Sequence, residues 1–253
     1  TRFVDFMRVL VPMAGDDTTP EGEQVNIYGN HVGSWNFAAT AYLNQWKVKI
    51  YYEHYFDDHS QMFFQYGRWK DGHIGLEITF PKNRFIDTFV YEGLGTKDQT
   101  GPMLYDSFWG EFEEQISAKD NYYNHYLYQG WQHWGMGIGN PLLPGPIYNK
   151  NGQITFISNR VLAHHIGFCG SPCQSLSYRM LLSYSRHWGT YDNPLNEIKK
   201  QFNSLFEVTY APQQLKGWSF TVSGAMDRAS MLGNNYGGML VIRKQGIIKS
   251  GNK

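Results

Sequence analysis

The sequence has no long hydrophobic run, no excess of charge of either sign and almost no cysteine. Its 253 residues contain no stretch of about 20 apolar residues, so transmembrane helices are excluded. Lys and Arg together number 22, as do Asp and Glu, which gives a net charge of zero and a pI near 7.1. A nucleic-acid-binding protein needs a basic excess to neutralise phosphates. We therefore expect no nucleic-acid partner.

The chain has two cysteines, Cys169 and Cys173, in the segment CGSPCQ. We expect this segment to be a short turn between two strands. In an oxidising compartment such as the periplasm the two thiols could form a short disulfide, and the alternative is a pair of reduced thiols with no role. A zinc site needs two more ligands, which the turn does not contain, so we expect no metal. Nothing in the sequence indicates a cofactor.

The sequence is rich in segments in which apolar and polar residues alternate, the pattern of a β-strand with two different faces. In residues 46–53, for example, Val48 and Ile50 alternate with Lys47 and Lys49. We predict ten strands, near residues 2–10, 33–43, 46–56, 73–80, 85–94, 159–168, 175–186, 202–211, 217–228 and 236–247.

The gaps between these strands alternate between short and long. The short gaps are 44–45, 81–84, 169–174 and 212–216, and the longer ones are 11–32, 57–72, 95–158, 187–201 and 229–235. Transmembrane β-barrels have short periplasmic turns on one side and larger surface loops on the other. The pattern therefore predicts an all-β, antiparallel transmembrane barrel over residues 1–253, in a Gram-negative outer membrane. The mean hydropathy of −0.48 does not contradict this, because only every second strand residue meets lipid.

Aromatic residues make up 17% of the chain. Trp46 and Trp218 lie at the turn ends of their predicted strands, and Trp35 and Trp188 at the loop ends, as in the aromatic girdles of membrane proteins. On the polar face we expect charges of both signs that pair within the lumen, from Lys47, Lys49, Glu53, Glu77, Arg179, Glu207 and Asp227.

The longest gap, residues 95–158, is where we expect a binding site, because loops of this length are usually functional. Aromatic planes stack on the apolar faces of sugar rings, and amides bond to sugar hydroxyls. The candidate carbohydrate-binding residues are Trp109, Tyr122, Tyr123, Tyr126, Tyr128, Trp131 and Trp134. The alternative is a loop that folds inward and plugs the lumen, with these aromatic side chains forming the small core of the plug.

Several long strings of residues resemble the Wzi-like capsule assembly family of outer-membrane barrels. They are GNHVGSW (29–35), YYEHYFDDHSQMFF (51–64), PKNRF (81–85), TKDQTGP (96–102), DNYYNHYLYQGWQHWGMGIGNPLL (120–143), YRMLLSYSRHWGTYDNPL (178–195), LKGWSFT (215–221) and YGGMLVIRK (236–244). Members of the family form a barrel of about eighteen strands, so the resemblance implies that this chain is the C-terminal portion of such a barrel. It also implies a non-enzymatic, lectin-like protein that binds capsular polysaccharide and helps to assemble or attach the capsule, with outer-membrane lipid and other outer-membrane proteins as further partners.

Two other classes remain open from the residues alone. A porin or channel, or a structural scaffold subunit of an outer-membrane complex, has the same strand pattern. A hydrolase would need a serine, a histidine and a third orienting group, and the pair Ser185 and His187 has no such third group nearby in the sequence.

Overall fold

The computed structural model describes residues 2–10, 13, 15–19, 24, 28–57, 59–62, 70–83, 85–105, 116, 118–127 and 129–246. These residues form mostly β structure. One large antiparallel sheet has nine strands, and a second sheet consists of the short strands β5 (Gln132–His133) and β6 (Met136–Gly137). The helical elements are α1 (Phe3–Leu10), α3 (His59–Met62) and the 3-10 turn η2 (Pro146–Tyr148). Within the described part of the chain, neither α-helix has the length and hydropathy needed to cross a membrane.

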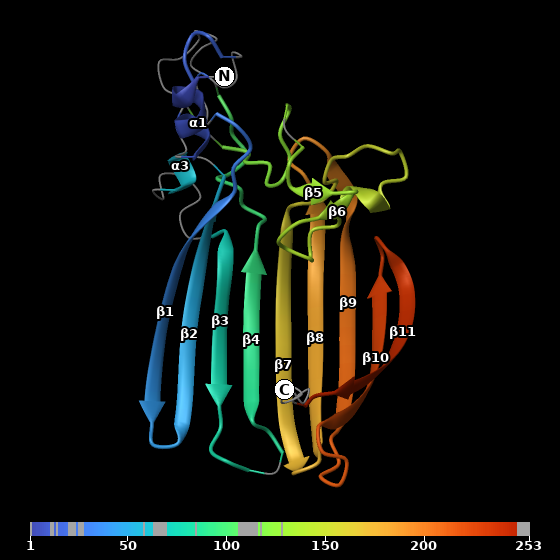
Figure 1. Cartoon of the computed structure of the whole chain (residues 1–253). Coiled ribbons are helices and arrows are strands. Elements are labelled where there is room, and N and C mark those ends of the chain that lie inside the picture. The colour runs from blue at the N-terminus through green and yellow to red at the C-terminus, as the bar shows by residue number, and fades with distance from the viewer. Residues whose placement is uncertain are drawn as a thin grey trace, which may run out of the picture.

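The large sheet is a meander in which neighbours in sequence are neighbours in space (Figure 1). Its strands are β1 (Gly33–Leu43), β2 (Trp46–Phe56), β3 (Gly72–Thr79), β4 (Thr88–Gly95), β7 (Val161–Cys173), β8 (Leu176–Gly189), β9 (Pro194–Tyr210), β10 (Trp218–Ala229) and β11 (Gly233–Lys244). Among the described residues β1 and β11 each pair with one strand only, so the sheet is open at both edges. The predicted antiparallel all-β class is confirmed, and a closed barrel is not found in this part of the chain.

Residues 2–10 were predicted to be a strand, and this prediction is wrong because they form helix α1. The apolar Phe3, Phe6 and Leu10 recur at helical spacing and give the helix one apolar side. The backbone N–H of Arg2 donates to the Asp5 carboxylate at 2.8 Å, which satisfies a donor at the helix start. The sheet therefore contains nine of the ten predicted strands.

The connections at one end of the sheet are short, as predicted. Asn44 adopts a left-handed conformation with φ of 57° in the two-residue turn between β1 and β2. The side chain of Asn83 organises the β3–β4 connection, because its oxygen accepts the backbone N–H of Phe85 at 2.8 Å and that of Ile86 at 2.9 Å. Strand β4 therefore begins at Thr88 and not at the predicted residue 85.

Two predicted connections lie elsewhere. The turn predicted at Cys169–Gln174 is wrong, because β7 continues to Cys173 and pairs it with Leu176 across Gln174 and Ser175. Both cysteines are free thiols, and they lie four residues apart in β7, with an irregularity in the strand between Gly170 and Cys173.

The long loop predicted at 187–201 is also wrong. Strand β8 runs to Gly189 and β9 begins at Pro194, which leaves a connection of residues 190–193. Proline is tolerated as the first residue of a strand because it needs no ladder hydrogen bond there. Only two connections between strands of the sheet, 57–71 and 96–160, are long loops.

The register of the sheet separates the side chains into two faces. Directly paired residues across the middle of six strands form an apolar row: Ala39, Ile50, Leu76, Tyr91, Ile166 and Leu182. This apolar face is open, with Ile50, Phe206 and Val222 exposed by 55%, 50% and 61%. The neighbouring row on the opposite face is polar: Tyr51, Glu92, His165, Ser183, Asn203 and Asp227. The predicted apolar and polar faces are confirmed.

Charges on the polar face pair across the strands. Lys47 lies 3.5 Å from Glu77, and Arg179 lies 3.4 Å from Glu207. The amide of Asn203 donates to Asp227 at 2.7 Å. The predicted pairing of charges on the polar face is therefore seen at these sites, and a lumen around them stays a prediction.

We expect both cysteines to react with a thiol reagent when the protein is unfolded in denaturant without a reducing agent. A thiol assay should count two per chain in the wild-type protein and one in Cys173→Ser. One or no thiol in the unreduced wild-type protein, with two appearing after reduction, would contradict the positions of Cys169 and Cys173 along β7.

Candidate functional site

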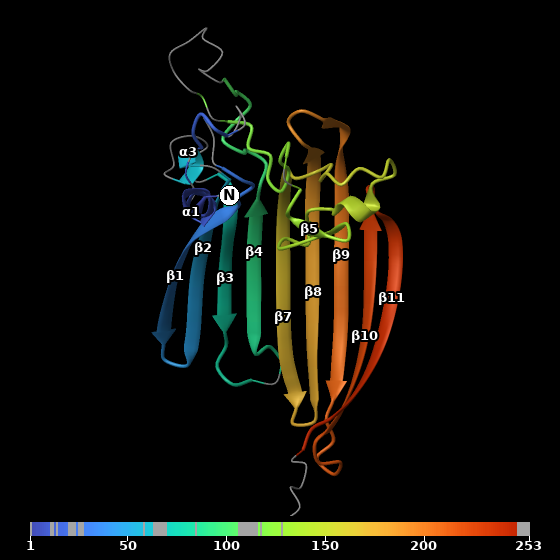
Figure 2. The same ribbon diagram turned by 45° about the horizontal axis from the view of Figure 1, so that its top comes forward.

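In the second long connection, residues 118–127 and 129–160 fold over the polar face near the loop end of the sheet. Figures 1 and 2 both show β5 and β6 against the upper part of the central strands. The contact contains a small buried core in which Tyr123, Leu143 and Phe156 of the loop pack against Leu94 of β4 and Ala163 of β7. The fold therefore places an aromatic cluster of the loop directly on the sheet.

Asp71, immediately before β3, anchors this loop. Its side chain is 1% exposed and accepts the backbone N–H groups of Asp98 at 2.9 Å and Gln99 at 2.5 Å. The hydroxyl of Tyr122 donates to the same carboxylate at 3.0 Å. One carboxylate thus joins both long connections of the sheet to each other.

Burial sets the protonation of this anchor. Burial raises the pKa of Asp71 to about 6, and the three hydrogen bonds that it accepts counter this only in part. Burial also raises the pKa of Tyr122, with the negative charge of Asp71 acting in the same direction, so the phenol stays protonated and remains a donor.

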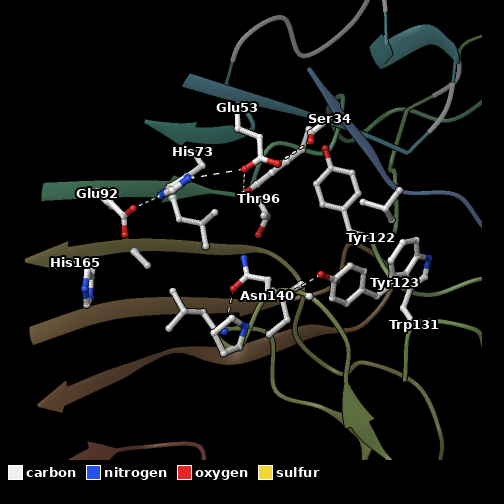
Figure 3. A pocket seen from close by; sticks show the side chains of 18 of the residues that line it. Ser34, Glu53, His73, Glu92, Thr96, Tyr122, Tyr123, Trp131, Asn140 and His165 are labelled. Carbon is white, nitrogen blue, oxygen red and sulfur yellow. Dashed lines mark hydrogen bonds and ion pairs between the residues drawn. The ribbon is translucent and has the colours of Figure 1, made fainter. Parts of the chain in front are cut away.

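A cavity of about 640 Å³ lies between the folded loop and the polar face (Figure 3). Its floor is a row of titratable side chains on β2, β3 and β4. His73 lies between two carboxylates, with Nδ1 3.8 Å from Glu53 and Nε2 3.5 Å from Glu92. Figure 3 shows the imidazole pointing toward both. A single imidazole therefore links the two carboxylates of the floor.

Hydroxyl groups complete the floor. Ser34 donates to Glu53 at 2.6 Å, and Tyr51 donates to Glu92. Farther along the sheet, His165 and Ser183 are hydrogen-bonded at 2.7 Å. Glu53 is thus held by a hydroxyl of the adjacent strand β1, and Glu92 by the hydroxyl of Tyr51, whose ring reaches from β2 across Gly75 of β3.

The opposite wall is aromatic and comes from the loop. The rings of Tyr123 and Trp131 are stacked, with centroids 5.3 Å apart and planes at 12°, and Tyr123 meets Phe156 edge to face at 5.1 Å. The hydroxyl of Tyr123 accepts the backbone N–H of Asn140 at 2.9 Å. Neither Lys nor Arg is among the described residues that line the cavity. The carboxylates of Glu53 and Glu92 therefore disfavour an anionic ligand in this cavity.

The structure divides the seven predicted carbohydrate-binding residues. Tyr122, Tyr123 and Trp131 line the cavity, while Tyr126 and Trp134 are 64% and 86% exposed on the outside of the loop. The remaining two, Trp109 and Tyr128, lie outside the described residues. Tyr123 belongs to the small buried core and Trp131 packs against it, while the plugging of a lumen stays a prediction.

Sequence reasoning missed His73, Glu92 and Asn140 as site residues. His73 and Glu92 occupy polar positions in alternating strands, so the strand pattern could have placed them on the same face as Glu53. Asn140 follows a glycine-rich stretch whose path cannot be read from spacing. The loop turns there with Gly139 at φ of 92°.

The other sequence candidates do not form a further site. Ser185 and His187 are hydrogen-bonded at 2.9 Å, but both are buried and neither lines the cavity. Within the described ranges, no group of three His, Cys, Asp or Glu residues is arranged to hold a metal ion.

No protein-family model, no curated protein and no solved structure matches this chain. The resemblance to the Wzi-like capsule assembly family therefore stays a prediction.

We expect Asp71→Asn to loosen residues 96–160. The amide nitrogen would face a backbone N–H donor, and a buried unsatisfied donor costs about 1–3 kcal/mol. Tyr122→Phe removes one hydrogen bond and should cost about 1 kcal/mol. Protease cleavage within the loop, quantified by mass spectrometry, should be lowest in the wild-type protein, higher in Tyr122→Phe and highest in Asp71→Asn. Equal cleavage of the wild-type protein and Asp71→Asn would contradict the anchor.

The raised pKa of Asp71 also predicts a pH dependence. The folded carboxyl binds its proton more tightly than the unfolded one, so its contribution to stability is full below pH 3.8 and is lost as the pH rises through about 6. The anchored loop should therefore be more stable at pH 5 than at pH 7, by about 1 kcal/mol. The same protease assay at both pH values, with a protease active at each, measures the difference. Asp71→Asn should abolish it, and a larger stability at pH 7 would contradict the assignment.

Proposed function

We propose that the chain is part of an outer-membrane β-barrel that binds capsular polysaccharide at its loop end without catalysing a reaction. The observation that carries the proposal is the two-faced sheet, with one open apolar face and one polar face on which the long loop is folded.

The apolar face supports a position in a membrane. Soluble proteins rarely expose contiguous apolar patches above a few hundred Å². Here the apolar rows continue through every strand of the large sheet, and many of their members are half exposed or more. Lipid satisfies such a surface, since transmembrane strands place apolar residues outward and polar residues toward the lumen.

Tryptophans near both ends of the strands fit the same position. Trp46 and Trp218 are the first residues of β2 and β10 at the turn end, while Trp35 and Trp188 lie near the loop end of β1 and β8. The ammonium group of Lys244 lies 5.4 Å from the ring centre of Trp218, and that of Lys97 lies 5.0 Å from Trp188. An indole with an adjacent cation is suited to the boundary between lipid and water.

The folded loop favours a ligand-binding scaffold over an open channel. Its core lies on the polar face, where an open pore would need water. The cavity under the loop offers what a sugar needs, an aromatic wall and fixed hydrogen-bonding groups. We therefore place polysaccharide binding before ion conduction in the proposal.

Matched lysine substitutions test the membrane position. Ala39 and Thr40 are adjacent, small and exposed in β1, but they belong to the apolar and the polar face respectively. In the full-length protein in lipid vesicles, Ala39→Lys should lower the free energy of unfolding by about 2–4 kcal/mol, and Thr40→Lys by much less. Urea titration followed by gel mobility measures both. Equal effects, or a larger effect at Thr40, would show that this face does not meet lipid.

Polysaccharide binding is tested by titrating the full-length, detergent-purified protein with the capsular polysaccharide of its host. Trp131 lines the cavity beside Tyr123, so saturable binding there should change the intrinsic tryptophan fluorescence. A Trp131→Phe variant serves as the control for the source of the signal. No binding at millimolar sugar, together with a steady ion current in a planar bilayer, would replace the proposal with a channel.

A further inference from the structure

A second cavity, of about 1070 Å³, lies on the other side of the loop and is not used above. It is a cleft between loop residues 121–129 and 151–157 on one side and residues 190–196, at the β8–β9 connection, on the other. We infer that this cleft binds an uncharged pyranose unit of a polysaccharide. The inference rests on the proposed function and names a subsite for it.

The position of the cleft makes it accessible to a surface polymer. A transmembrane strand needs about 9–11 residues to cross a bilayer. Strand β9 has 17 residues and β8 has 14, and the cleft lies where these two strands meet at the loop end. The strands are therefore long enough to carry the connection 190–193 beyond the lipid.

One wall of the cleft presents an aromatic platform. Tyr126 is 64% exposed, and its ring is stacked on that of His125 with centroids 4.8 Å apart and planes at 29°. His125 is itself oriented by the backbone N–H of Leu127, which donates to its Nδ1 at 3.1 Å. The phenol ring is thus packed against the imidazole, and its exposed part is accessible for stacking against a sugar ring.

The cleft also presents amides that the fold does not use. Asn124 is occupied, because its side chain exchanges two hydrogen bonds with the backbone of Phe156, both at 2.8 Å. By contrast, Gln153, Asn193 and Asn196 line the cleft, and their side-chain amides have no hydrogen-bond partner within the described part of the chain. Each such amide has both donors and an acceptor for sugar hydroxyls.

The charge of the cleft restricts the class of sugar. Among the described lining residues the one carboxylate belongs to Asp192, which lies 3.5 Å from the ammonium group of Lys119. Neither Lys nor Arg is among the described lining residues, so this part of the lining has no permanent cation for a uronate, sulfate or phosphate group. An uncharged hexose satisfies the platform and the amides without leaving a charge unpaired.

The cleft and the first cavity are separate sites. Phe156 lines the cleft, Tyr123 lines the cavity, and the edge-to-face contact of these two rings lies between them. Tyr126 lines the cleft and does not line the first cavity. Its substitution therefore changes the cleft and leaves the floor of the first cavity intact.

The test compares two exposed aromatic residues of the same loop. Trp134 is 86% exposed and lines neither cavity, so Trp134→Ala is the control for Tyr126→Ala. Calorimetric titration of the full-length protein with the capsular polysaccharide should show about tenfold weaker binding for Tyr126→Ala and unchanged binding for Trp134→Ala. Asn196→Ala, in an exposed position, should weaken binding several-fold. Methyl glucoside and methyl galactoside should compete with the polymer, while glucuronate should not.

The outcomes separate this inference from the proposed function. Tight wild-type binding that is unchanged in both Tyr126→Ala and Asn196→Ala overturns the cleft and leaves the proposed function standing. Equal weakening by Tyr126→Ala and Trp134→Ala overturns it as well, because the effect would not follow the cleft. Competition by glucuronate alone contradicts the uncharged class. The absence of wild-type binding removes the proposed function, and the inference fails with it.

Discussion

The in-register antiparallel pairing of alternating sequences is the constraint on which the rest of this structure depends. Because side chains alternate between faces, pairing Ile50 with Leu76 also pairs Lys49 with Glu77 and Tyr51 with Gly75. A shift of one residue would bring Lys49 to the apolar face and Ile50 to the polar one. The apolar face can then remain open, while the polar face satisfies its own charges and receives the loop.

The folded loop turns this sheet into a binding scaffold. Asp71 ties the loop backbone at Asp98 and Gln99 to the entry of β3, and the Tyr123 cluster seats the loop on β4 and β7. Two cavities result, one facing the carboxylates and imidazoles of the sheet and one, the cleft, between the loop and the β8–β9 connection. Residues that anchor the loop, such as Asp71 and Tyr122, are buried, whereas Tyr126 in the cleft is exposed. Structural and binding roles are thus divided between different side chains of one aromatic segment.

Much of the sheet could be predicted from the sequence because strand periodicity is a local property. Residues 33–43 and 46–56 are strands with the predicted bounds. The errors arose where a short sequence pattern fits two kinds of secondary structure. Residues 2–10 carry apolar residues that fit a helix as well as a strand, and the turn-forming residues between 187 and 201 bend the chain only at 190–193. CGSPCQ looked like a turn, yet pairing with β8 keeps Cys169 and Cys173 in the strand.

The site was harder to predict because it combines distant segments. The aromatic richness of 95–158 led to the prediction of Tyr123, Trp131 and Tyr126 as binding residues, but it did not separate core positions from exposed ones. His73 and Glu92 come together with Glu53 only through the register of the sheet. Asn193 and Asn196 line the cleft only because β8 and β9 are longer than predicted. Neither the strand register nor the strand length can be predicted from the spacing of residues along the chain.

The most direct test of this account is a spin-label scan along β9 of the full-length protein in lipid vesicles. Single cysteines would be placed from residue 203 to residue 208 in a background without Cys169 and Cys173, and collision with oxygen and with a water-soluble nickel chelate would be measured at each site. The account predicts a period of two, with oxygen favoured at residues 204, 206 and 208 and the nickel chelate favoured, or both reagents excluded, at 203, 205 and 207. Uniform access of the water-soluble reagent to both faces would contradict a sheet whose apolar face lies in a membrane.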